Sequence, residues 1–136
     1  MLKKFIVIEK EKCGYYAASV IGLPGYRIKA RTLKELIKSI PNSVRRYMKV
    51  EEYAYEADFV GVNIVKPRKP ASKKFTVIIE KAGKDYIAVV PSLPGCFTQG
   101  RTIDELMRYA EEVIELCYDK KNDCKADFVG VQLIEV

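Results

Sequence analysis

Hydrophobic and polar positions follow the same pattern twice along the chain. Residues 5–65 and 75–134 each open with an apolar run, continue through an alternating segment, and close with a stretch that begins with the hexapeptide Ala-Asp-Phe-Val-Gly-Val. The tripeptide Leu-Pro-Gly recurs from Leu23 to Leu93, and the hexapeptide recurs from Ala57 to Ala126. A repeat of this length is typical of a small domain and too long for a solenoid unit. The sequence therefore predicts two copies of one fold.

The alternating segment predicts a strand with one buried face. Three residues recur at every second position, namely Tyr16, Ala18 and Val20 as Tyr86, Ala88 and Val90. Agreement with period two marks the side of a strand that packs against a core. The apolar runs 5–8 and 75–79 precede this segment across turn-forming residues, so we expect an antiparallel hairpin in each copy. The Leu-Pro-Gly corner should lead into a short third strand, at 26–29 and 96–99.

A helix signal follows in both copies. Thr32 with Glu35, and Thr102 with Glu105, have the spacing of a capping box, in which the threonine accepts an amide hydrogen bond and the glutamate reaches back. Apolar residues then recur every three or four positions over about four turns. Pro41 is expected to kink or restart the first helix, because its ring removes an interior hydrogen bond at a cost of about 3 kcal/mol.

The fold class that these elements predict is α+β. Each copy reads β-β-β-α-β, a small and mostly antiparallel sheet with one helix on one face. We place the first repeat at 1–65, a linker rich in proline and lysine at 66–73, and the second repeat at 74–136. Units of this size are marginally stable alone, so we expect them to pack together as an internal pseudo-dimer. Open sheet edges could also support a homo-oligomer.

Composition and cysteine usage favour a cytoplasmic protein. Hydrophobic residues make up 49% and charged residues 31% of the chain, and no apolar run is long enough for a membrane span or a signal peptide. The cysteines Cys13, Cys96, Cys117 and Cys124 form no CxxC pair, and histidine is absent, so we predict no zinc site. Ordinary reduced cysteines are expected. A Cys117–Cys124 disulfide is the alternative if the source is a hyperthermophile.

One stretch of the second copy is specific enough to suggest a family. It reads Tyr-Ile-Ala-Val-Val-Pro-Ser-Leu-Pro-Gly-Cys-Phe-Thr over residues 86–98, then Gly100-Arg101-Thr102 and Glu105-Leu106. This pattern resembles the HicB-like antitoxins, and the first copy shares it without the Pro-Ser lead-in. The resemblance implies a partial RNase-H-like fold without catalysis, and a small HicA-like toxin that cleaves mRNA as partner. Relatives often add a DNA-binding domain, of which this sequence shows no pattern.

Catalytic chemistry finds little support in the residues. A nuclease of the RNase H type needs several carboxylates around divalent metal ions. Outside the capping boxes, Asp58 and its counterpart Asp127 are the acidic position that we identify in both copies, and a turn or strand-start role suits them better. The commonest general base, histidine, is missing, and no glycine-rich phosphate loop is present. We expect no enzyme activity, no metal and no cofactor.

The two predicted helices carry opposite charge, which suggests two partner hypotheses beside an ordinary solvated surface. Residues 31–50 have a net charge of +5 and residues 101–120 have −3. An acidic helix could attract a basic toxin through Asp104, Glu111, Glu112 and Glu115. Alternatively, the basic helix could bind nucleic acid through Lys34, Lys38, Arg45, Arg46 and Lys49.

Overall fold

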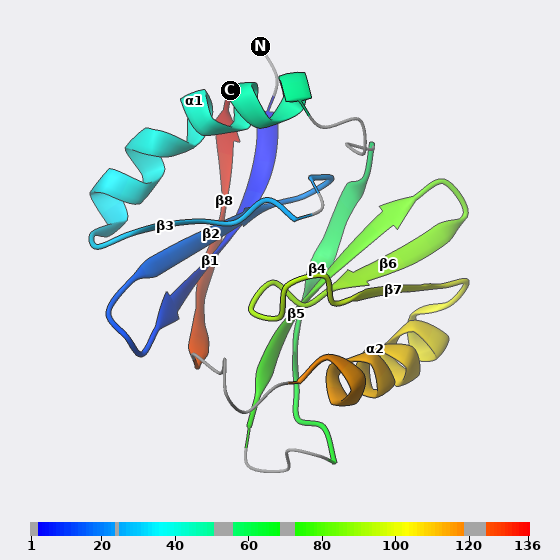
Figure 1. Cartoon of the computed structure of the whole chain (residues 1–136). Coiled ribbons are helices and arrows are strands. Elements are labelled where there is room, and N and C mark those ends of the chain that lie inside the picture. The colour runs from blue at the N-terminus through cyan, green and yellow to red at the C-terminus, as the bar shows by residue number, and fades with distance from the viewer. Residues whose placement is uncertain (1–2, 24, 51–55, 69–72, 119–124) are drawn as a thin grey trace.

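A computed structural model describes residues 3–23, 25–50, 56–68, 73–118 and 125–136, and in these ranges the chain forms two four-stranded sheets and two helices (Figure 1). The predicted α+β class is confirmed. In chain order the elements are β1 (Lys3–Glu11), β2 (Tyr16–Val20), β3 (Ile28–Ala30), α1 (Leu33–Val50), β4 (Asp58–Val65), β5 (Phe75–Ala82), β6 (Asp85–Val89), β7 (Phe97–Gly100), α2 (Ile103–Cys117) and β8 (Ala126–Glu135).

Each sheet takes three strands from one sequence copy and its fourth strand from the other. The strand orders are β3-β2-β1-β8 and β4-β5-β6-β7, and neighbouring strands are antiparallel. β8, from the end of the chain, pairs with β1 from Lys3 opposite Glu135 to Glu11 opposite Ala126. β4 pairs with β5 in the same way. The predicted β-β-β-α-β order therefore holds along the chain, while the final strands are exchanged in space.

Both helices begin where the capping boxes predict. The amide of Glu35 donates to Thr32 Oγ1 at 3.1 Å, and the amide of Glu105 donates to Thr102 Oγ1 at 3.1 Å. The expectation that Pro41 restarts the first helix is wrong, because α1 is continuous from Leu33 to Val50. Its ribbon bends part-way along, in keeping with the predicted kink (Figure 1). Packing of one apolar side of α1 on the sheet outweighs the single hydrogen bond that a proline removes.

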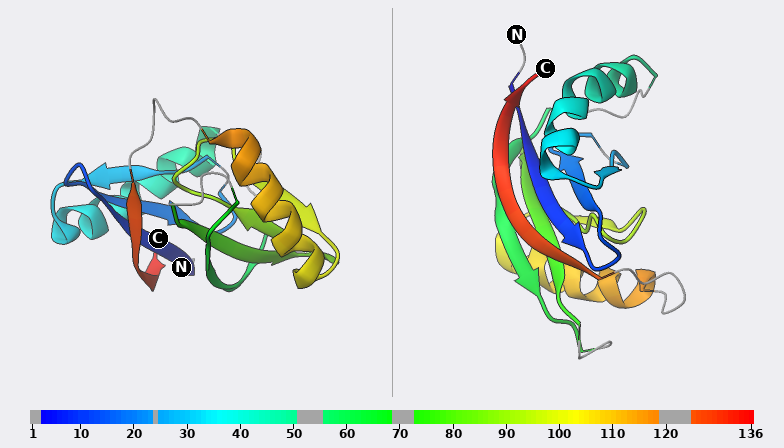
Figure 2. Two further views of the ribbon diagram at one scale, coloured as in Figure 1. Left: turned by 90° about the horizontal axis from the view of Figure 1, so that it is seen from below. Right: turned by 90° about the vertical axis from the view of Figure 1, so that its left-hand side faces the viewer.

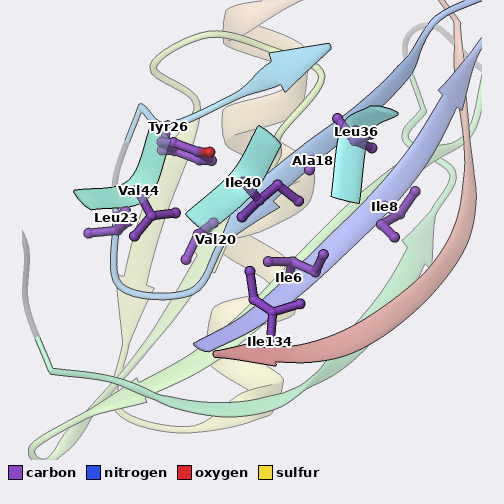
Figure 3. Packing of buried hydrophobic residues seen from close by; sticks show 10 residues of the cluster. All are labelled: Ile6, Ile8, Ala18, Val20, Leu23, Tyr26, Leu36, Ile40, Val44 and Ile134. Atoms are coloured by element: carbon purple, nitrogen blue, oxygen red, sulfur yellow. The ribbon is translucent and has the colours of Figure 1, made fainter. Parts of the chain in front are cut away.

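Two hydrophobic cores lie between a sheet and its helix. Figure 3 shows the first, built from Ile6, Ile8, Ala18, Val20, Leu23, Tyr26, Leu36, Ile40, Val44 and Ile134. The second contains Phe75, Val77, Ile79, Ala88, Val90, Cys96, Leu106, Ala110 and Ile114. The alternate positions that recur between the copies, Ala18 with Val20 and Ala88 with Val90, face these cores as predicted. Ile134 of β8 completes the first core, so the exchanged strand also contributes to packing.

A third cluster joins the two sheets. Val7, Ile21 and Ile78 are buried there against Ala57, Phe59, Val62 and Val89. The rings of Phe5 and Phe59 stack with centroids 5.2 Å apart, and the amide of Gly22 donates to Glu80 Oε1 at 3.3 Å. The sheets are thus connected by strand exchange and by side-chain packing. Neither helix, over the residues described, has the length and apolar character that a bilayer span requires.

Candidate partner-binding surfaces

The acidic residues predicted to meet a partner lie on α2. Leu106, Ala110 and Ile114 are buried against the second sheet, which leaves the opposite side of the helix to solvent. On α2 Asp104, Glu112 and Glu115 are exposed and Glu111 is half-buried. Within the described part of the chain, none of these four carboxylates takes part in an ion pair. We call Asp104, Glu111, Glu112 and Glu115 the acidic α2 surface.

Leu116 adds an apolar side chain beside this surface. It is 85% exposed, more than any other large hydrophobic side chain described. Glu112 lies one helical turn before Leu116, so the two side chains share one side of α2. Sequence reasoning missed Leu116, although its place outside the apolar stripe was a usable signal. An apolar side chain among carboxylates matches a basic partner with an apolar depression.

The five basic residues predicted to contact nucleic acid are all exposed on α1. Arg45 is held locally, since its guanidinium donates to Asn42 Oδ1 at 2.9 Å and to the Pro41 carbonyl at 3.2 Å. Arg46 lines a cavity of about 380 Å³ between the corner before β3 and α1. Its walls are Gly25, Tyr26, Arg27, Ile28, Ser43, Arg46 and Tyr47. Arg27 is already paired with Glu9 and Glu11, so Arg46 is the cation of this lining that is left to meet an anionic group.

The same corner differs in the second copy. Tyr26 and Tyr47 pack edge to face with ring centroids 5.4 Å apart, and Cys96 and Cys117 replace them at the corresponding positions. Burial, with the neighbouring Cys117, raises the pKa of the Cys96 thiol to about 12. A thiol that stays protonated at neutral pH is a poor nucleophile. Cys96 and Cys117 are free thiols. Cys124 lies outside the described residues, but Cys117 is a free thiol, so the alternative of a Cys117–Cys124 disulfide is wrong.

A second acidic position shared by the two copies escaped the sequence analysis. When the strands are matched by their core-facing residues, Glu9 of β1 corresponds to Glu80 of β5, and a lysine follows each. Both glutamates are buried, with 0% and 2% of their surface exposed. Asp58 and Asp127 are therefore not the only acidic position that the two copies share outside the capping boxes. An Ile-Glu-Lys tripeptide at the end of both apolar runs was the signal.

Glu9 is paired with a cation, and so is Glu11, a third buried glutamate at the end of β1. Arg27 Nη1 lies 2.8 Å from Glu9 Oε1, and Lys29 Nζ lies 2.6 Å from Glu11 Oε1. Burial raises the pKa of Glu9, and the Arg27 guanidinium offsets only part of this effect. Asp58 and Asp127 are exposed. Among the residues described, no group of three or more carboxylates or thiols is arranged to hold a metal ion.

Comparisons with known proteins agree on one kind of relative. Residues 75–135 match a family described as HicB_like antitoxin of bacterial toxin-antitoxin system. The chain is similar to a UPF0150 protein of Archaeoglobus fulgidus, with 51% identity over 65 residues that cover 46% of this chain and 94% of the relative. A UPF0150 protein of Synechocystis is 42% identical over 66 residues, 47% of this chain and 96% of the relative.

A third relative, a UPF0150 protein of Thermotoga maritima, is 38% identical over 72 residues that cover 50% of this chain and 96% of the relative. All three relatives are thus about half as long as this chain, which is the length of one sequence copy. No solved structure gave a significant match.

Proposed function

Because this chain belongs to the HicB-like antitoxin family, we propose that it is a non-catalytic, cytoplasmic antitoxin that neutralises a small, basic, HicA-like ribonuclease by covering it. Family membership supports an antitoxin-type role, and the acidic α2 surface supports the choice of a basic partner. The observation that carries the proposal is the set of unpaired carboxylates around the exposed Leu116.

The two kinds of side chain would have separate effects on binding. Carboxylates attract a basic protein from a distance and reject acidic ones, which raises the association rate and the selectivity. Leu116 would be buried on contact, and full burial of a leucine contributes about 2 kcal/mol. The basic residues of α1 would repel the same partner. Opposite charge on the two helices therefore restricts a basic toxin to α2.

Charge reversal on α2 tests this proposal. We expect the wild-type protein, purified from nuclease-treated lysate, to carry a stoichiometric small basic protein whose ribonuclease activity it suppresses. Changing Glu111, Glu112 and Glu115 to lysine should weaken capture by about tenfold or more, because attraction becomes repulsion. The free energy of unfolding should change by no more than about 0.5 kcal/mol per substitution, since none of the three side chains is buried. The measurements are mass spectrometry, titrated inhibition of RNA cleavage, and urea unfolding.

The matched control reverses charge on the other helix. A variant with Lys38→Glu and Arg45→Glu should retain capture. If capture and inhibition survive the α2 reversal unchanged, the acidic α2 surface is not the binding site. Absence of any ribonuclease partner in wild-type material would contradict the antitoxin proposal itself.

A second candidate is binding of nucleic acid by the first copy. It is favoured by the five exposed cations of α1 and by the place of Arg46 in the wall of the cavity. Contacts to phosphates make affinity fall steeply with salt. Recovery of nucleic acid only when nuclease is omitted, lost in the Lys38→Glu and Arg45→Glu variant, would select this candidate over the antitoxin role.

A further inference from the structure

The cavity beside Arg46 has the size of a small-molecule site. Its volume is about 380 Å³, near the lower end of the range of ligand pockets, and it lies between α1 and the corner that precedes β3. The two helices lie toward opposite ends of the molecule (Figure 2, right panel), so a ligand in this cavity would not cover the acidic α2 surface. The cavity is therefore separate from the surface proposed for the toxin.

Arg46 supplies the available positive charge of this cavity. Arg27, the other cation of the wall, is held by Glu9 and Glu11. Arg46 is exposed on α1 and forms no ion pair with another residue of the described chain. A guanidinium that is not paired within the protein presents a fork of donors, which matches the oxygens of a phosphate group. The charge of the wall thus favours an anionic ligand.

A buried hydroxyl belongs to the same wall. Tyr26 is 5% exposed, and its hydroxyl makes no hydrogen bond of ordinary geometry within the described residues. Burial raises the pKa of Tyr26, and the nearby Ser43 and Arg46 offset only part of this effect. The hydroxyl therefore stays protonated at neutral pH, and Ser43 is the neighbouring oxygen that can accept from it. In that arrangement the proton of the Ser43 hydroxyl is left to donate into the cavity.

The second copy keeps the backbone of this corner but none of its polar side chains. The amide of Tyr26 donates to the Leu23 carbonyl at 3.2 Å. In the same way, the amide of Cys96 donates to the Leu93 carbonyl at 3.0 Å. The five polar residues of the cavity wall are all replaced there: Tyr26, Arg27, Ser43, Arg46 and Tyr47 by Cys96, Phe97, Val113, Leu116 and Cys117. The corner therefore closes without a guanidinium or hydroxyls, so packing alone does not explain them in the first copy.

We propose that this cavity binds the phosphate group of a nucleotide, with Arg46 and Ser43 donating to its oxygens and Tyr26 positioning the Ser43 hydroxyl. The rings of Tyr26 and Tyr47 and the side chain of Ile28 form much of the remaining wall, which suits a base or a ribose better than a bare inorganic ion. A free nucleotide and the end of an RNA chain share this chemistry. Unlike the second candidate function, the proposal requires one phosphate in the cavity and no row of contacts along α1. It does not depend on the antitoxin role.

Calorimetric titration of the full chain tests the proposal, with adenosine monophosphate as one probe and a short single-stranded RNA that carries a terminal phosphate as the other. We expect saturable binding at one site. Arg46→Leu, which introduces the residue type of the second copy, should weaken binding about tenfold, because a charge-assisted hydrogen bond is lost. Tyr26→Phe keeps the ring and should weaken binding several-fold. In Ser43→Ala the further change Tyr26→Phe should have no effect, because the tyrosine acts through the serine.

The matched control is Arg45→Leu, which removes the same charge one residue away and should bind as wild type does. Saturation by adenosine monophosphate would identify a free nucleotide as the ligand, and saturation by the RNA alone would identify the end of an RNA chain. Equal weakening by Arg45→Leu and Arg46→Leu would show attraction spread along α1 and would overturn the cavity site. Saturation by neither probe at millimolar concentration would overturn it as well. Toxin capture by Arg46→Leu should equal that of wild type, so this test and that of the antitoxin role fail independently.

Discussion

Burial has a larger effect on the pKa of Glu9 than its ion pair with Arg27 has. Its side chain is fully covered where β1 faces β5, and this burial raises its pKa, while Arg27 and the nearby Thr76 of β5 lower it by less. Glu80, its counterpart, is equally buried and accepts the amide of Gly22 from the other sheet. A buried ion pair of this kind does not by itself stabilise a fold. Glu9 and Glu80 thus place two ionisable groups where the two sheets pack against each other.

The raised pKa of Glu9 predicts a pH dependence of stability. Between its unfolded value near 4.5 and its higher native value, the folded state binds more protons, so stability falls as pH rises through this window. Glu9→Gln is neutral at all pH values and removes this slope. We therefore expect the stability of wild type minus that of Glu9→Gln to decrease as pH rises, measured by urea unfolding at a series of pH values. A flat difference for Glu9→Gln would contradict the prediction.

At the scale of elements, helices and hairpins follow local chemistry closely. The third strands begin one or two residues later than predicted, at Ile28 and Phe97, because the corner uses those residues before pairing starts. The helix starts agree with the threonine caps. The continuous path of α1 through Pro41 does not follow from local propensity, since packing of Leu36, Ile40 and Val44 in the core decides it.

The cap of α2 provides a prediction at this scale. Thr102→Ala should lower the free energy of unfolding by about 1 kcal/mol, because the amide of Glu105 loses its acceptor at the helix start. Thr102→Ser keeps an oxygen acceptor and should remain within a few tenths of a kcal/mol of wild type. Urea unfolding measures both variants. Equal loss in the two would show that the methyl group, and not the hydrogen bond, matters.

At the scale of the whole molecule, strand exchange makes each sheet depend on both ends of the chain. The first core receives Ile134 from β8, and the second core is packed by Val65 of β4. These residues occupy corresponding positions in the two copies. In a chain that did not exchange its final strands, each would pack in the core of its own copy. Shortening one of these side chains should therefore destabilise the sheet in which its strand is paired, which shows where each final strand lies.

We expect Ile134→Ala to cost about 3 kcal/mol, as for other buried isoleucines, and to loosen the first sheet selectively. Amide hydrogen exchange should show lost protection in β1, β2 and α1, with β5 and β6 less affected. Val65→Ala is the matched counterpart and should act on β5, β6 and α2. The opposite pattern, in which Ile134→Ala loosens β5 and β6, would show that the strands are not exchanged.

The sequence by itself determined the α+β class, the order of elements, the hairpins and the helix starts, because these depend on contacts within a few residues. It also determined the opposite charges of the two helices. In the fold these charges lie at the acidic α2 surface and at the exposed basic residues of α1. Two identical hexapeptides, however, are equally good partners for β1 and β5, so local pattern could not predict which one each strand takes.

Only the tertiary structure decided the exchange of β4 and β8, the burial of Glu9 and Glu80, and the exposure of Leu116 and Phe128. The physical reason is that burial depends on contacts between residues far apart in the chain. Phe59 and Phe128 stand in identical hexapeptides, yet the ring of Phe5 stacks on Phe59 while Phe128 is exposed. Such differences depend on which distant side chain the fold places beside each residue. A local sequence pattern does not contain that information.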